Sequence, residues 1–171
     1  MGASTVTEGA SSDQSLCIDV QWVTDDVPEK ASANWQQWVS AALGAAGRSP
    51  AGEALAIRVV GNDESQSLNE GYRDKTGPTN VLAFPADDDL PDFLADEAGE
   101  LGDLIICMPV VTREAREQGK SLISHLAHMT VHGSLHLLGY DHISTVEAEE
   151  MEALEVQALE SLGIPNPYSS Q

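Results

Sequence analysis

Three histidines near the C-terminal end of this 171-residue chain have the spacing of a metal site. They lie in the stretch His132-Gly-Ser-Leu-His136-Leu-Leu-Gly139-Tyr-Asp141-His142. Residues four apart share one face of an α-helix, so the imidazoles of His132 and His136 can reach one ion. Gly139 can turn the chain where the helix ends, which lets His142 return as a third ligand. Three nitrogen ligands leave one position of a zinc ion open, as is typical of a catalytic metal.

The ligand spacing is that of the metzincin metalloproteases, but one residue of their motif is missing. Those enzymes need a glutamate directly after the first histidine, as general base for the attacking water. Gly133 occupies that position here and has no side chain that could move a proton. The sequence therefore keeps the metal-binding frame and disfavours peptide hydrolysis by that route.

Two more histidines, His125 and His128, fall on the same helical stripe as the first two ligands. One ion is spanned by a single pair four residues apart plus a returning ligand. We therefore interpret His125 and His128 either as residues that contact the ligands but not the metal, or as polar core residues. For His125 we favour the structural role. The alternative for the whole set is ordinary helix histidines, which the spacing and the glycine turn disfavour.

The elements that must carry these residues alternate between strand and helix patterns. Apolar and alternating runs predict strands at 16–23, 54–60, 81–84 and 100–108, with an acidic loop at 86–99. Apolar stripes predict helices at 32–46, 63–73, 109–118, 121–138 and 145–162, with Asn62 as the N-cap of the second. The predicted class is α+β with mixed α/β character: a single small mixed sheet of about four strands packed with about five helices, and the zinc site on the central helix.

The length fits one domain, at 16–171. Residues 1–15 are small, polar and acidic without the features of a targeting peptide, and we expect a disordered N-terminal extension. No apolar run reaches the roughly 20 residues that span a bilayer. Cys17 and Cys107 are too few for a disulfide framework, so we expect buried thiols and a cytoplasmic location.

The net charge of −20, from 28 acidic and 8 basic residues, disfavours non-specific attraction to nucleic acid. The distribution of the basic residues tempers this conclusion, because several lie in the middle of the chain. If they converge on one cleft, a local positive site forms on an acidic protein. These residues are Arg73, Lys75, Arg113, Arg116 and Lys120.

Several further segments, together with the histidine stretch, carry a resemblance to a known family. They are Leu68-Asn-Glu-Gly-Tyr72-Arg73, Thr79-Asn80-Val81-Leu82-Ala83-Phe84-Pro85, Leu101-Gly102-Asp103 and Ala148-Glu-Glu-Met151-Glu-Ala-Leu154. In this order the chain, over residues 16–168, resembles the YbeY family, bacterial endoribonucleases of ribosomal RNA maturation. It departs from many relatives at Ala83, where they carry Ser or Thr, and in its strong acidity and long N-terminal tail.

The resemblance implies a metal-dependent endoribonuclease domain that binds one zinc ion per chain through His132, His136 and His142, with Arg73 as a functional arginine in the cleft. It implies single-strand-specific cleavage in 3′-end maturation of small-subunit (16S) ribosomal RNA and in ribosome quality control. The implied partners are ribosomal RNA and the small ribosomal subunit, with ribosomal proteins or assembly GTPases as further candidates. No membrane and no DNA partner is expected.

The residues allow this chemistry but leave alternatives open. Arg73 offers a planar fork for phosphate oxygens, although a surface ion pair with Asp74 or Glu70 would also explain it. Asp141 is a candidate for proton transfer or ligand orientation, and equally a turn residue. The catalytic set we predict is Arg73, His132 and Asp141, with Lys75 and Thr79 as possible phosphate contacts and Asp103 as a strand-end residue.

Two other functions fit part of the pattern. One is a zinc metallohydrolase with metalloprotease-like geometry. The other is a non-catalytic ribosome-assembly module in which zinc only holds the fold and the acidic surface meets basic proteins.

Overall fold

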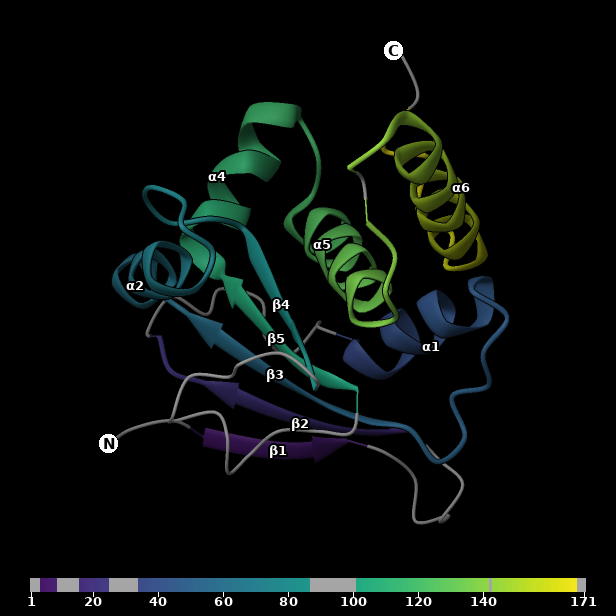
Figure 1. The fold of residues 1–171 in the computed structure, drawn as a ribbon, viewed down its shortest axis with the longest axis horizontal. Helices are drawn as coiled ribbons and strands as arrows, with labels where there is room; N and C mark the ends of the chain where they lie inside the picture. The colour runs from purple at the N-terminus through teal and green to yellow at the C-terminus, as the bar shows by residue number, and fades with distance from the viewer. Residues whose placement is uncertain (1–3, 9–15, 25–33, 87–100, 142, 169–171) are drawn as a thin grey trace.

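A computed structural model describes the chain at residues 4–8, 16–24, 34–86, 101–141 and 143–168. Over these residues it contains one mixed sheet of five strands and five helices (Figure 1). The α+β prediction is confirmed, with one strand more than expected. None of the described helices is both long enough and apolar enough to cross a membrane.

The sheet has the strand order β1-β2-β3-β5-β4. Three central strands run parallel: β2 (Cys17–Trp22), β3 (Ala54–Val60) and β5 (Gly102–Cys107). The outer strands β1 (Ser4–Glu8) and β4 (Val81–Pro85) are antiparallel to β2 and β5, respectively. All six residues of β5 are buried, as expected for a strand that is covered on both faces.

Helices cover both faces of the sheet, and each face has its own core. On one face Leu104 and Ile106 of β5 join the larger core with α1 (Trp35–Ala45), α5 (Leu122–Leu137) and α6 (Thr145–Ser161). On the other face Ile105 and Cys107 join a smaller core with α2 (Asn62–Tyr72) and the start of α4 (Met108–Gln118). Figure 1 shows α5 between the sheet and α6, so the histidine helix is the central one.

Local sequence signals explain where these helices begin and end. Ser121 caps α5, and Ser144 with Glu147 forms a complete capping box at the start of α6. Helix α4 has a proline in its first turn and ends at Gly119, in the left-handed conformation. The predicted cap of α2 is wrong by one residue: Gly61 is the N-cap, and Asn62 is the first residue of the helix.

Two predictions about the N-terminal part are corrected. Residues 4–8 are not disordered, because they pair with β2 as strand β1; the other residues of the expected extension, 1–3 and 9–15, lie outside the described ranges. Cys17 is exposed, whereas Cys107 is buried as predicted. The reason is that β2 buries alternate residues, beginning with Ile18, and Cys17 faces the other side. The predicted acidic loop lies outside the described residues except for Ala86.

Helix α5 approaches the sheet unusually closely at Gly133. A Cβ atom at this position would lie 2.8 Å from Cδ2 of Leu104 and 3.1 Å from Cγ2 of Val81. A glutamate, as metalloproteases carry here, would have to displace these two packed side chains. Gly133 thus has two consequences. It leaves the site without a general base at this position, and it allows the histidine helix to pack closely on strands β4 and β5.

Gly102 is the position where the sheet most strictly requires glycine. Its φ of +133° is disfavoured for L side chains, and an added Cβ would lie 2.2 Å from the carbonyl oxygen of Phe84. Gly102 pairs with Pro85, so it fixes how the end of β4 meets the start of β5. This end of β4 borders the cleft described below.

We predict that Gly102→Ala lowers the free energy of unfolding by about 1–3 kcal/mol or more, because backbone atoms must move. The matched control is Gly44→Ala in α1, where an added Cβ meets nothing within 4 Å. The control should raise stability by about 0.5–1 kcal/mol, since alanine favours a helix. Chemical denaturation of both variants measures the difference, and equal stabilities would contradict the close approach at Gly102.

Candidate metal centre and active-site cleft

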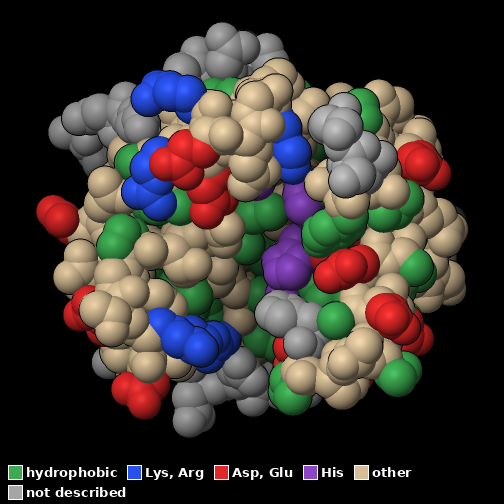
Figure 2. Space-filling model, turned by 90° about the horizontal axis from the view of Figure 1, so that it is seen from above, with side chains coloured by type: hydrophobic (Ala, Val, Ile, Leu, Met, Phe, Trp, Pro, Cys, Tyr) green, Lys and Arg blue, Asp and Glu red, His purple; other side chains and the backbone are tan. Residues whose placement is uncertain are grey.

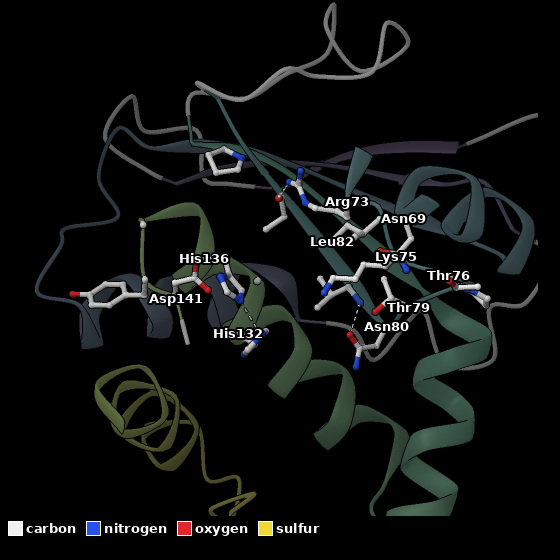
Figure 3. Close-up of a pocket in the computed structure, with 17 residues that line it drawn as sticks. Asn69, Arg73, Lys75, Thr76, Thr79, Asn80, Leu82, His132, His136 and Asp141 are labelled. Atoms are coloured by element: carbon white, nitrogen blue, oxygen red, sulfur yellow. Dashed lines mark hydrogen bonds between the residues drawn. The ribbon is translucent and has the colours of Figure 1, made fainter. Parts of the chain in front are cut away.

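A cleft of about 830 Å³ opens between the C-terminal half of α5, strand β4 and the loop that leads from α2 to β4. Figure 2 shows histidine side chains in a hollow of the surface, with Lys and Arg side chains around it. Four predicted site residues line this cleft together: Arg73, His132, His136 and Asp141 (Figure 3). Lys75 and Thr79, predicted as phosphate contacts, also line it.

His132 and His136 direct the same ring atom at each other. Their Nε2 atoms are 3.1 Å apart, close to the about 3.3 Å between two nitrogens bound tetrahedrally to one zinc ion. The four-residue helical spacing produces this convergence, as predicted. After the C-cap Leu138, Gly139 adopts φ +102° and turns the chain out of the helix, also as predicted.

The third predicted ligand, His142, lies outside the described residues. Within the described part of the chain, no three His, Cys, Asp or Glu side chains come together as a metal-binding group. The described site therefore contains two of the three predicted ligands, together with the turn that leads to the third.

Glu155 of α6 orients His132, and it is a site residue that no motif in the sequence indicated. Its Oε2 accepts a hydrogen bond of 2.6 Å from Nδ1 of His132, a contact that in the neutral ring favours the tautomer with Nε2 unprotonated. Its Oε1 accepts hydrogen bonds from Nε2 of His128, at 2.8 Å, and from the hydroxyl of Tyr168. The available signal was a glutamate on the buried stripe of α6, four residues after Met151 and three before Ala158.

The Glu155 carboxylate is ionised although only 1% of the residue is exposed. Burial alone would raise its pKa, but hydrogen bonds from His128, His132 and Tyr168, together with the electrostatic attraction of His132, outweigh this and lower the pKa to about 2. The hydrogen bond to Glu155 places His128 behind His132, which is one of the two roles predicted for it. His125 is a buried core residue bound to Glu114 at 2.8 Å, and its burial lowers its pKa.

Arg73 stands at the C-terminal end of α2 and reaches over β4. Its Nη2 donates to the carbonyl of Ala83 at 2.6 Å, and Nη1 donates to the carbonyl of Tyr72 at 3.1 Å. The guanidinium carbon lies 4.4 Å from the centre of the Phe84 ring, a cation–π contact. The arginine is thus anchored at the cleft wall with a fixed plane.

Strand β4 is an edge of the described sheet, and its outer edge faces Arg73. The carbonyl of Asn80 accepts from Cys107 and the amide of Ala86 donates to Leu101, so the even-numbered residues pair with β5. Val81 and Ala83 therefore point their backbone groups outward. The Val81 amide donates to the side chain of Asn80 at 2.6 Å, and Arg73 covers the Ala83 carbonyl. This edge is partly closed to the addition of a peptide strand.

The loop across from the histidines is held by two buried polar residues of α2. Ser65 accepts a hydrogen bond from the Thr79 amide at 2.9 Å and donates one to the Thr79 carbonyl at 3.0 Å. Asn69 donates to the carbonyl of Gly77 at 2.8 Å. Both residues were missed in the sequence, where they read as ordinary polar positions of a helix. They fix the wall that carries Lys75 and Thr79.

The remaining predicted residues divide between the cleft and the core. Asp141 lines the cleft beside His136 (Figure 3). Asp103 is buried near the start of β5 and does not line the cleft. Of the five basic residues whose convergence would form a positive site, only Arg73 and Lys75 line the cleft; Arg113 and Arg116 lie on α4, and Lys120 follows its C-cap Gly119.

Comparison with known proteins identifies the relatives of this chain. Residues 18–163 match the family model described as endoribonuclease YbeY. Proteins named endoribonuclease YbeY are 49% identical in Colwellia psychrerythraea (90% of this chain, 97% of that protein) and 51% identical in Pseudomonas syringae pv. tomato (90% and 89%). Another from Alkalilimnicola ehrlichii is 49% identical over 95% of this chain and 97% of its own length. A solution structure from Thermotoga maritima matches with a TM-score of 0.50 and 22% identity, over 89% of this chain and 97% of that one, and shows a shared fold.

We predict that Glu155→Gln of the metal-free protein loses stability relative to the wild type at neutral pH, and that this difference disappears in acid. A carboxylate with a lowered pKa stabilises the folded state fully above its unfolded value of 4.5, and this is lost as pH falls towards about 2. The lowering corresponds to about 3 kcal/mol. Denaturant titrations across this pH range measure it.

The control is Glu152→Gln, an exposed position of the same helix. Its stability difference from the wild type should stay nearly constant over the same range. A constant difference for Glu155→Gln as well would show that the buried carboxylate is not held as an anion.

Proposed function

This chain belongs to the YbeY family of endoribonucleases, and we propose that it is a zinc-dependent enzyme that cleaves single-stranded RNA in 3′-end maturation of 16S ribosomal RNA and in ribosome quality control. Membership makes it a nuclease with an RNA substrate. The observation that best supports the finer proposal is the convergent Nε2 pair of His132 and His136, backed by Glu155, in a cleft that also contains Arg73.

We propose that His132, His136 and His142 hold one zinc ion. Imidazole nitrogens suit zinc, and the Nε2 separation of the first two residues fits two ligands of one ion. Glu155 keeps the proton of His132 on Nδ1, so Nε2 can act as a ligand. When bound, zinc with three neutral ligands would supply an acidified water molecule or polarise a phosphoryl oxygen.

The protein's own groups then bind and orient the scissile phosphate. Arg73 contributes a fixed positive charge with a planar set of donors, suited to the charge that builds on phosphate oxygens during cleavage. Lys75 and Thr79 on the opposite wall contact neighbouring phosphates of the strand. Asp141, beside His136, accepts or relays a proton.

Two observations weigh against a peptidase of metalloprotease geometry. Position 133 has no room for the catalytic glutamate without displacing Leu104 and Val81. The outer edge of β4, where an extended peptide would pair, is partly occupied by Arg73 and Asn80. A purely structural zinc also fits less well, because His132 and His136 face a large open cleft.

The proposed partners are ribosomal RNA and the small ribosomal subunit in the cytoplasm, with ribosomal proteins or assembly GTPases as further partners. The net charge of −20 means that RNA binding must depend on local cationic groups rather than on a basic surface. Arg73 and Lys75 are the basic residues that the described cleft supplies.

We predict that the purified protein binds about one equivalent of zinc and cleaves a labelled single-stranded RNA but not casein, and that a chelator stops cleavage. His136→Ala should lose most of the zinc and the RNA cleavage, because two nitrogen ligands are too few for a stable site. Elemental analysis and the paired digests measure these outcomes. Cleavage of casein alone would overturn the proposed function, and full zinc retention by His136→Ala would overturn the ligand assignment.

We predict that Arg73→Ala retains zinc and fold but slows RNA cleavage by about 100-fold or more, the usual effect of removing a group that stabilises transition-state charge. The matched control is Arg113→Ala on α4, an exposed arginine 3.9 Å from Glu117. The control should cleave at the wild-type rate. If both variants cleave equally fast, Arg73 is a structural residue of the β4 edge.

A further inference from the structure

The chain after α6 folds back and places Tyr168 against Glu155 and His128, the two residues behind His132. Gly163, with φ +79°, starts this return, and the amide of Ile164 donates to the carbonyl of Leu159. The ring of Tyr168 meets the ring of His128 edge-on, with centroids 5.6 Å apart. Its hydroxyl donates to Oε1 of Glu155 and lies 3.3 Å from Nε2 of His128.

Glu155 connects this tyrosine to the metal site. Its two oxygens accept hydrogen bonds from different donors. Oε2 accepts from Nδ1 of His132, while Oε1 accepts from His128 and Tyr168. The carboxylate is almost fully buried, so protein donors rather than bulk water determine its orientation. Two donors on Oε1 limit its rotation and keep Oε2 directed at His132.

We infer that Tyr168 is a positioning residue of the metal centre: through Glu155 its hydroxyl holds His132 in the ring orientation and tautomer that present Nε2 as a ligand. This inference rests on the proposed function, because it takes His132 to be a zinc ligand. It adds a residue near the C-terminus that does not line the cleft.

The chemistry of Tyr168 suits this role. The hydroxyl must remain a donor over the working pH range, and burial together with the charge of Glu155 raises the pKa of the phenol. The residue itself is 46% exposed, so removal of its hydroxyl leaves no large cavity. Tyr168→Phe therefore tests the hydrogen bond while the ring still covers Glu155 and His128.

The test is a competition titration of the metal-free protein with zinc and a chromophoric chelator. We expect Tyr168→Phe to weaken zinc binding by about 3- to 10-fold, less than the about 10- to 100-fold typical when a direct partner of a ligand is lost. Glu155→Gln should give the larger loss. Tyr72→Phe is the matched control, because Tyr72 is similarly exposed (44%) and packs on Phe84; its affinity should equal that of the wild type.

A second comparison separates positioning from simple stabilisation. Because Tyr168 acts through Glu155, Tyr168→Phe should change zinc affinity little when it is added to Glu155→Gln. A purely structural role would instead lower the melting temperature of the metal-free protein and leave the zinc affinity unchanged. The visible spectrum of the cobalt-substituted protein should shift in Tyr168→Phe and not in Tyr72→Phe.

The outcomes distinguish this inference from the proposed function. If the wild type binds zinc and Tyr168→Phe binds it equally well or more tightly, this inference is overturned and the proposed function stands. If the wild type binds no zinc, the zinc dependence of the proposed function fails, and this inference fails with it.

Discussion

A single buried carboxylate links the two helices of the candidate metal centre. Glu155 of α6 accepts hydrogen bonds from His128 and His132 of α5 and from Tyr168, which follows α6. Burial of an anion is costly unless nearby groups donate hydrogen bonds to it. Here three donors satisfy it, and one of them belongs to a proposed zinc ligand. The same contact therefore joins α6 to α5, closes the C-terminal segment over the core and fixes the tautomer of His132.

The close approach of α5 to the sheet determines what lies opposite the histidines. Because Gly133 has no side chain, the helix lies directly on Leu104 and Val81, and His132 and His136 face the loop before β4. Arg73 then spans from the end of α2 to the outer edge of β4. A larger residue at position 133 would widen this spacing. The same glycine thus leaves no room for a protease-type base and lets the proposed metal ligands face the cleft that Arg73 also lines.

The parts of this site that depend on local spacing could be predicted from the sequence, and the parts that depend on tertiary contact could not. The pairing of His132 with His136 follows from the helical repeat, and the turn at Gly139 follows from the conformational freedom of glycine. Strand β1 pairs with the next strand, β2, across only eight residues (9–16), but residues 4–8 lack the apolar run that predicts the other strands. Glu155 looked like one more acidic residue on an acidic helix, because its partners lie 23 and 27 residues away.

An acidic chain can bind an anionic substrate because salt screens the repulsion between distant charges. At physiological ionic strength the Debye length is about 8 Å, so surface carboxylates farther than this from a phosphate in the cleft are largely screened. Arg73 and Lys75 line the cleft, where a bound phosphate would meet their positive charges, and the proposed zinc would add two more. The carboxylate of Glu155 faces His132 from behind rather than the cleft, so its charge acts on the ligand more than on the substrate. The net charge therefore disfavours non-specific RNA binding, while Arg73 and Lys75 provide local positive charge in the cleft.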